Sequence, residues 1–125
     1  MGKKYLIDTN TLIDAQMKKL PEKELQFLAD IINEDFTVSF ITYIEFLGYK
    51  YVTQAAADFI ALADIIEINK PIIDTCIALR KTHNIKLPDA IIAATALANG
   101  LFLISHNASD FKNIPGLNVI DLWNL

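Results

Sequence analysis

The stretch LPDAIIAATALANGLFLIS, residues 87–105, decides the fold. Pro88 stands where a first helical residue belongs and Asn99-Gly100 is a good helix stop, so the sequence predicts a helix between them. Almost every residue of that helix is apolar, which places it at the centre of the molecule rather than on the surface. Residues 101–104 then predict a short apolar β-strand.

The same alternation of strand and helix extends outward to both ends of the chain. The sequence predicts further strands at residues 5–7, 36–40, 65–68 and 119–122. It predicts helices over 11–19, 21–34, from 42, from 53, and from 71 to about 83. Strands separated by helices pair in parallel through right-handed crossovers, so we expect a three-layer α/β sandwich. In such sheets the ligand crevice lies beyond the carboxyl ends of the strands.

Length and composition indicate one domain, residues 1–125, with its own hydrophobic core, because 53% of the residues are hydrophobic and 21% are charged. The lone Cys76 excludes a disulfide within the chain and fits a reducing compartment. No apolar run approaches the roughly 18 residues of a membrane span, and we expect a cytoplasmic protein without a membrane partner. The net charge of −4 argues against nucleic-acid binding through bulk charge but not against a nuclease built on carboxylates.

Several common kinds of site are excluded by their missing residues. Phosphate loops of the GxGxxG or GxxxxGK type are absent, because the glycines stand only at positions 2, 48, 100 and 116. No serine has the flanking glycines of a nucleophile elbow. His83 and His106 are too far apart to form a local metal pair, so we expect both to be ordinary surface or loop residues.

Four carboxylates stand where the predicted sheet presents its crevice. Asp8 follows the first strand, and Glu45 lies early in the helix after the second. Asp89 opens the central helix, and Asp110 lies in the loop after the fourth strand. Each also has a structural explanation: Asp8 suits a helix N-cap, and Thr42 with Glu45 fits a capping box. Asp89 complements a helix dipole, and Asp110 suits a turn.

The coincidence of these four carboxylates carries more weight than any one of them. Clustered carboxylates repel one another unless a cation lies among them. Hard oxygen ligands suit Mg²⁺ or Mn²⁺, and a pair of such ions orients water for in-line displacement at phosphorus. The sequence therefore predicts a divalent metal site at the crevice.

Four segments together resemble the PIN-domain family, and among its members the VapC-type toxins of toxin–antitoxin pairs. They are YLIDTNTLID (5–14), ITYIEFLGY (41–49), LPDAIIAATALANG (87–100) and LFLISHNASDF (101–111). The resemblance covers nearly the whole chain, with the segments in the family's order. It implies a parallel five-stranded sheet flanked by helices and a Mg²⁺- or Mn²⁺-dependent endoribonuclease, the toxin of a type II pair.

The resemblance also implies roles for single residues. Asp8, Glu45 and Asp89 match the family's first three acids, which are its metal ligands and catalytic groups. Asn10 is expected to orient Asp8, and Ser105 stands where the family has Thr or Ser.

The fourth acid is where this sequence departs from many relatives. Asn107 occupies one position at which relatives carry an acid, and Asp110 occupies another. Both alternatives stay open, with Asp110 as the acid that can take part in catalysis, and so does the number of metal ions.

Two other function classes compete with a ribonuclease. An aspartyl-phosphate phosphatase also begins with a strand and an Asp, but it needs a second Asp two residues after Asp8, where this chain has Asn10. A non-catalytic PIN-like binding domain is the third possibility, and acids retained at three separate sites argue against it.

RNA needs a local basic patch on a chain of net charge −4. The candidate is Arg80 and Lys81 with Lys86, close to His83; the alternative is a solvated helix end that complements the dipole.

The resemblance further implies an antitoxin partner and a homodimer. Large apolar and aromatic residues crowd the segment after the second strand, more than one helix face can bury: Tyr43, Phe46, Leu47, Tyr49, Tyr51 and Val52. We therefore expect a hydrophobic groove near residues 43–63 that accepts an amphipathic antitoxin helix.

Overall fold

The apolar helix predicted at residues 88–99 is present as α6 (Leu87–Asn99) in the computed structural model, which describes residues 4–124. Its inward residues are almost completely buried: Ala90, Ile92, Ala93, Ala94 and Ala96. Gly100 ends the helix with a φ of 64°, a left-handed conformation that glycine adopts without steric cost. The central position expected for this helix is therefore confirmed.

Five short strands follow the predicted alternation with helices, and every observed pairing is parallel. β1 (Tyr5–Ile7), β4 (Phe102–Ile104) and β5 (Val119–Ile120) form one sheet in the order β1-β4-β5. β2 (Thr37–Ser39) pairs with β3 (Asp64–Ile66).

The single five-stranded sheet implied by the resemblance is not what the described residues show. β1 and β2 are neighbours in space, but the hydrogen-bonded ladders assigned within residues 4–124 join the strands as a group of three and a group of two. Each strand has at most three residues, and β2 passes directly into a helix at Phe40, so little extended backbone is left to continue the ladder.

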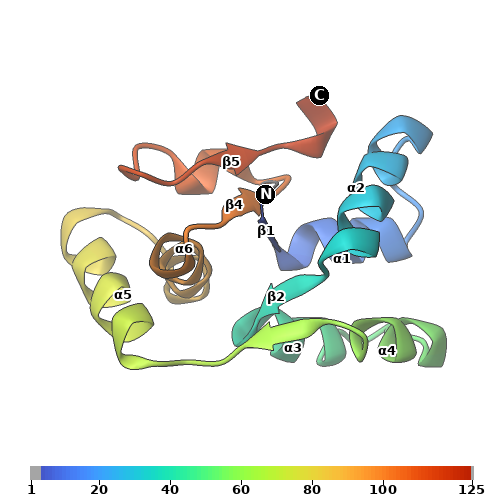
Figure 1. Cartoon of the computed structure of the whole chain (residues 1–125), viewed down its shortest axis with the longest axis horizontal. Helices are drawn as coiled ribbons and strands as arrows, with labels where there is room; N and C mark the ends of the chain where they lie inside the picture. Colours follow the sequence, from blue (N-terminus) through green and yellow to red (C-terminus); the bar gives the residue numbers. More distant parts are fainter. Residues whose placement is uncertain (1–3, 125) are drawn as a thin grey trace.

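The remaining helices surround the strands as Figure 1 shows, with α5 and α6 on one side and α1 and α2 on the other. Their bounds are α1 (Thr9–Gln16), α2 (Glu22–Glu34), α3 (Phe40–Leu47), α4 (Gln54–Ile60) and α5 (Lys70–Thr82), with 3₁₀ turns η1 (Ala108–Phe111) and η2 (Leu122–Asn124). Several predicted bounds shift by a few residues, and two of these shifts concern the site: α1 begins at Thr9 rather than residue 11, and α3 begins at Phe40 rather than Thr42. Both shifts arise because Asp8 and Ser39 act as N-caps.

The strands are covered on both faces, as expected for a three-layer sandwich. Leu6 and Leu103 contribute to a core shared with α5 and α6, whereas Ile7 and Ile104 contribute to a second core shared with α1 to α4. This division follows from the alternation of side chains along a strand. Cys76 is a buried free thiol in the first core. Among the helices within residues 4–124, none has the length and apolar character needed to cross a membrane.

Candidate active site

The carboxyl ends of β1, β2 and β4 bring the predicted site residues to one edge of the strands. Asp8 directly follows β1, and its backbone N–H extends the ladder by donating to the Ile104 carbonyl at 2.9 Å. Ser105 directly follows β4, and β2 leads into α3, which carries Glu45. The sheet therefore gathers groups that are 37 to 97 residues apart in sequence, as the crevice rule predicts.

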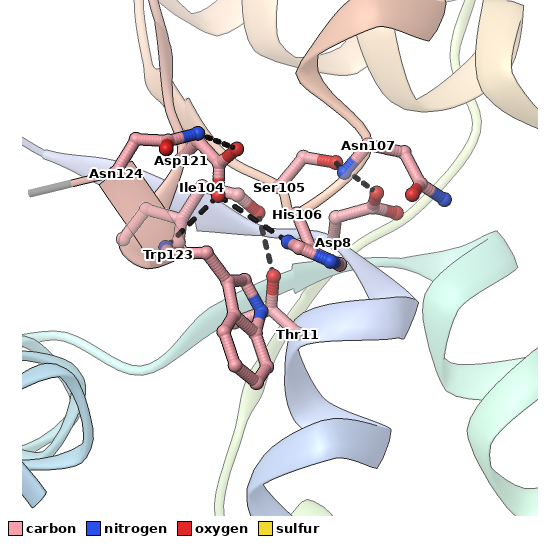
Figure 2. Close-up of polar contacts among 9 residues, drawn as sticks. All are labelled: Asp8, Thr11, Ile104, Ser105, His106, Asn107, Asp121, Trp123 and Asn124. Atoms are coloured by element: carbon pink, nitrogen blue, oxygen red, sulfur yellow. Dashed lines mark hydrogen bonds and ion pairs between the residues drawn. The ribbon is translucent and has the colours of Figure 1, made fainter. Parts of the chain in front are cut away.

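The carboxylate of Asp8 is 4% exposed and is held by two hydrogen bonds. The Ser105 hydroxyl donates to Oδ2 at 2.7 Å, and the Thr9 backbone N–H donates to Oδ1 at 2.8 Å. The Ser105 oxygen in turn accepts the Asn107 backbone N–H at 3.1 Å, so both neighbours of this hydroxyl are defined (Figure 2). Asp8 is thus both the N-cap of α1 and a buried carboxylate at the crevice.

Glu45 is held by Thr9, a residue that was not predicted to belong to the site. The Thr9 hydroxyl donates to Glu45 Oε1 at 2.7 Å. The hydroxyls of Thr9 and Thr42 lie 3.1 Å apart, and the Ser39 hydroxyl donates to Thr42 at 3.2 Å, which makes a chain of hydroxyls ending on Glu45. Adjacency to Asp8 was the only sequence feature that could have indicated Thr9.

The capping box expected between Thr42 and Glu45 is not formed. Because α3 begins at Phe40, its N-cap is Ser39, whose Oγ accepts the Thr42 backbone N–H at 3.2 Å. Glu45 therefore lies beyond the first turn, and its carboxylate reaches the Thr9 hydroxyl instead of a helix amide.

Burial and mutual repulsion raise the pKa of two of the acids. Burial raises the pKa of Asp8 to about 6; the Ser105 and Thr9 hydrogen bonds oppose this shift, and the charges of Asp89 and Glu45 add to it. Burial also raises the pKa of Asp89, with further contributions from the charges of Asp110 and Glu45 and an opposing one from Lys86. Asp8, Glu45 and Asp89 therefore interact electrostatically, and Asp110 joins them through Asp89.

None of the four is neutralised by an ion pair with Lys, Arg or His in the described part of the chain. No three His, Cys, Asp or Glu side chains within residues 4–124 are close enough to chelate an ion directly. The oxygen-only donor set and the unrelieved repulsion nevertheless fit a hard divalent cation such as Mg²⁺, which needs only one or two carboxylates because it retains several waters.

The two predicted supporting asparagines and the candidate fourth acid occupy different places. Asn10 is exposed and makes no hydrogen bond to Asp8, whose carboxylate is bonded by Thr9 and Ser105 in the described chain. Asn107 takes part through its backbone N–H on Ser105. Asp110 is exposed on η1, and its charge reaches Asp89.

A cavity of about 600 Å³ opens beside Asp89 and Asp110. One wall is the turn between α5 and α6, which carries Lys86. The other wall is the segment after η1, which carries Lys112. The predicted basic patch is thereby divided, because Arg80 and Lys81 line another groove of about 570 Å³ between α5 and α6 that is otherwise mainly apolar. Lys112 was not predicted, although it lies two residues after Asp110.

The C-terminal turn η2 packs beside the loop that follows β4 (Figure 2). The ring of His106 lies 4.8 Å from the ring of Trp123, and its Nδ1 is 3.4 Å from Asp121 Oδ1. Asp121 also accepts the Trp123 backbone N–H at 2.9 Å and the Asn124 side-chain amide at 2.8 Å. His106 thus has a structural role next to Ser105, as expected of an ordinary loop residue.

Where the hydrophobic groove near residues 43–63 was expected, the structure has only a small cavity, which lies between α1, α3 and the start of α4. It has a volume of about 50 Å³, and Phe46, Tyr49 and Tyr51 contribute to its lining. Tyr51 is 63% exposed, and its ring meets that of Tyr49 edge-on at 5.8 Å. An aromatic surface is therefore left open on this side of the isolated chain.

Comparisons with known proteins agree with this architecture. The sequence matches the model of the PIN domain over residues 5–117. A chain in a toxin–antitoxin complex from Klebsiella pneumoniae is 36% identical, with a TM-score of 0.75, over 94% of this chain and 97% of that one. A chain of VapBC-1 from nontypeable Haemophilus influenzae is 26% identical, with a TM-score of 0.77, over 95% and 98%. DNA-bound VapBC from Salmonella typhimurium shares the fold, with 23% identity and a TM-score of 0.77 over 97% and 99%. No curated protein matches the sequence.

Proposed function

Because this chain belongs to the PIN-domain family, as a toxin of the VapC type, we propose that it is a Mg²⁺- or Mn²⁺-dependent endoribonuclease acting in the cytoplasm. The observation that carries the proposal is the set of carboxylates that share one edge of the strands and form no ion pair with Lys, Arg or His in the described chain. Such an arrangement costs stability in the free protein, and a function that supplies cations accounts for its presence.

Asp8, Glu45 and Asp89 would hold the metal together with the waters that the ion retains. A bound divalent ion supplies charge neutralisation at the scissile phosphate and a more acidic water. Ser105 and Thr9 fix Asp8 through both of its oxygens, and the Thr9 hydroxyl also fixes Glu45. These bonds set the positions of two ligands before any substrate arrives, which lowers the entropic cost of assembling the site.

Asp110 is suited to a different task. It is exposed on the rim of the cavity, and its charge raises the pKa of the neighbouring Asp89. We assign it to positioning or deprotonating the attacking water, a role that needs access to solvent. Asn107 has no carboxylate to offer, and its backbone already serves Ser105.

The test is cleavage of a 5′-labelled single-stranded RNA by the purified chain, followed on a gel with Mg²⁺, Mn²⁺ or EDTA. We expect cutting with either metal, none in EDTA, and a loss of more than about 100-fold in Asp8→Asn, because loss of a mere supporting group costs about 10–100-fold. Asp30→Asn makes the same charge change on the exposed face of α2 and should cut like the parent. Equal cutting by both variants would overturn the assignment.

We also propose an antitoxin partner, since the similar structures include toxin–antitoxin complexes. The aromatic surface of Tyr49 and Tyr51 is suited to an amphipathic helix, because Tyr51 is exposed in the isolated chain and Tyr49 is only partly buried. A homodimer is proposed on the groove between α5 and α6, where Ile73 and Ile77 are 40% and 50% exposed.

A further inference from the structure

The cavity beside Asp89 and Asp110 combines features that the metal site alone does not require. Its volume of about 600 Å³ lies within the range of roughly 300–1,000 Å³ that is usual for small-molecule sites. It begins where two of the acids are and extends away from them between the α5–α6 turn and the segment that follows η1. A group seated there would therefore be next to whatever the acids hold.

The charges on its walls favour a phosphate-bearing occupant. Lys86 precedes α6 by one residue, close enough to lower the pKa of Asp89, and Lys112 directly follows η1 on the facing wall. Neither lysine forms an ion pair within residues 4–124. Lys86 and Lys112 therefore place two ammonium groups on the same lining as the carboxylates of Asp89 and Asp110, and these ammonium groups are the ones available to a phosphate.

His83 joins the two walls. Its Nε2 lies 2.9 Å from the Asn113 carbonyl oxygen, which only accepts, so Nε2 carries the hydrogen and donates it. Its Nδ1 lies 2.8 Å from the Thr82 hydroxyl. Asn113 has a φ of 65°, a left-handed conformation that asparagine tolerates, and this conformation is accompanied by the His83 bond. The cavity is therefore braced in the free protein.

We propose that this cavity binds the nucleotide next to the cleaved phosphate in single-stranded RNA, with Lys86 and Lys112 contacting its phosphates. The proposal rests on the proposed ribonuclease function. The neutral amides of Asn84 and Asn113 on the same walls offer donors and acceptors to a base edge. An unpaired base can leave its stack and enter a cavity, whereas a paired base within a duplex cannot.

Arg80 and Lys81 are excluded from this subsite by their place in the fold. They line the groove between α5 and α6 together with Ile73 and Ile77, and not the cavity beside Asp89. Removal of the Arg80 and Lys81 charges therefore serves as a control for removal of the Lys86 and Lys112 charges.

The test measures binding rather than cleavage. A fluorescein-labelled single-stranded RNA of 12 nucleotides is titrated by anisotropy with the full-length Asp8→Asn chain in EDTA, across a series of salt concentrations, and a gel verifies that the RNA stays intact. Adding Lys86→Gln and Lys112→Gln should lower the slope of log K against log salt by about 1.4, which is about 0.7 for each lost contact. A labelled RNA duplex should bind more weakly and show no such change.

Two control variants carry matched charge changes: Lys19→Gln with Lys23→Gln, both exposed near or on α2, and Arg80→Gln with Lys81→Gln. Both should keep the parent slope. A parent slope in the Lys86/Lys112 variant, or an equal loss in all three, would overturn the subsite. Failure of the native chain to cut RNA with Mn²⁺ would refute the ribonuclease and leave the binding result standing, so the two failures are distinguishable.

Discussion

Burial of the Asp8 carboxylate disfavours its charged form, whereas the proposed function requires that form. A buried acid with a pKa of about 6 binds its proton more tightly than an exposed aspartate does, yet a metal ligand has to be charged. The Ser105 and Thr9 donors reduce this conflict without removing it. The remaining cost is released when a cation enters, so folding stability and metal binding are linked through this one group.

This linkage predicts a pH dependence of stability in the metal-free protein. The pKa of Asp8 rises from 3.8 to about 6 on folding, so the folded state binds the proton more tightly. Stability should therefore fall as the pH rises from about 4 to above 6, by up to about 3 kcal/mol. Asp8→Asn has no such proton, and its free energy of unfolding relative to the parent should increase over that interval. Urea unfolding in EDTA at pH 4.5, 5.5 and 7.5 measures the difference; parallel curves for the two chains would contradict it.

A second prediction concerns the hydroxyl of Thr9. Thr9→Val keeps the shape of the side chain and removes the hydroxyl that donates to Glu45 at 2.7 Å. Because loss of a group that orients a metal ligand costs about 10–100-fold in affinity, Mn²⁺ binding measured by calorimetry should weaken by that factor. Thr11→Val is the matched control two residues along α1, where the hydroxyl meets the Ile104 carbonyl at 3.4 Å. Equal Mn²⁺ affinity in the two variants would show that Thr9 does not position Glu45.

The sequence could place the acids but not their partners. Asp8 and Asp89 were found because one ends a strand and the other begins a helix, and both are local features of the chain. The bond from Thr9 to Glu45 spans 36 residues and depends on how α1 packs against α3. The resemblance favoured Asn10, rather than Thr9, as the residue that orients Asp8. Which of the two side chains faces the crevice depends on where α1 begins, and it begins directly after Asp8.

At the scale of elements, the start of α3 matters most to the site. Its cap, Ser39, belongs to β2 and is fully buried, so one residue ends a strand, begins a helix and starts the hydroxyl chain toward Glu45. The capping box at Thr42 was a wrong prediction, because a Ser three residues earlier offers the same chemistry and the strand ends there. Pattern alone does not rank two such caps. β2 has only three residues, and its length could not be predicted from the sequence. The division of the strands into a group of three and a group of two was therefore not predictable either.

Two helix caps allow stability and activity to be separated. Ser39→Ala and Thr53→Ala each remove the side-chain acceptor of a helix amide, at 3.2 Å for α3 and 3.1 Å for α4. Each should lower the free energy of unfolding in urea by about 1 kcal/mol. Only Ser39→Ala should also reduce RNA cleavage, since it interrupts the hydroxyls that lead to Glu45. Similar cleavage by the two variants would mean that Ser39 is a cap and nothing more.

The whole molecule separates its polar and apolar surfaces. The acids and the cavity lined by Lys86 and Lys112 occupy the carboxyl edge of the strands, whereas apolar side chains line two other features of the surface. One is the groove between α5 and α6, and the other is the aromatic surface beside α1, α3 and α4. Such a division allows protein partners to bind without displacing RNA by direct overlap, so control of the nuclease by a partner would require an additional group that reaches the acids.

The proposed antitoxin helix gives the final prediction. Tyr49→Ser with Tyr51→Ser removes two rings that meet edge-on at 5.8 Å, one of them 63% exposed. Aromatic anchors of an interface typically contribute about 2 kcal/mol or more each, so loss of both should lower affinity for the protein encoded by an adjacent antitoxin-like reading frame by about 700-fold, and loss of one by about 30-fold. Ile73→Ser with Ile77→Ser removes exposed apolar groups from the other groove; it should lower the mass of the chain in solution toward that of a monomer and leave antitoxin affinity intact. Mn²⁺ binding should match the parent in both variants, because neither pair touches the acids. If the isoleucine pair instead weakened the antitoxin complex while the tyrosine pair did not, the antitoxin would bind the groove between α5 and α6.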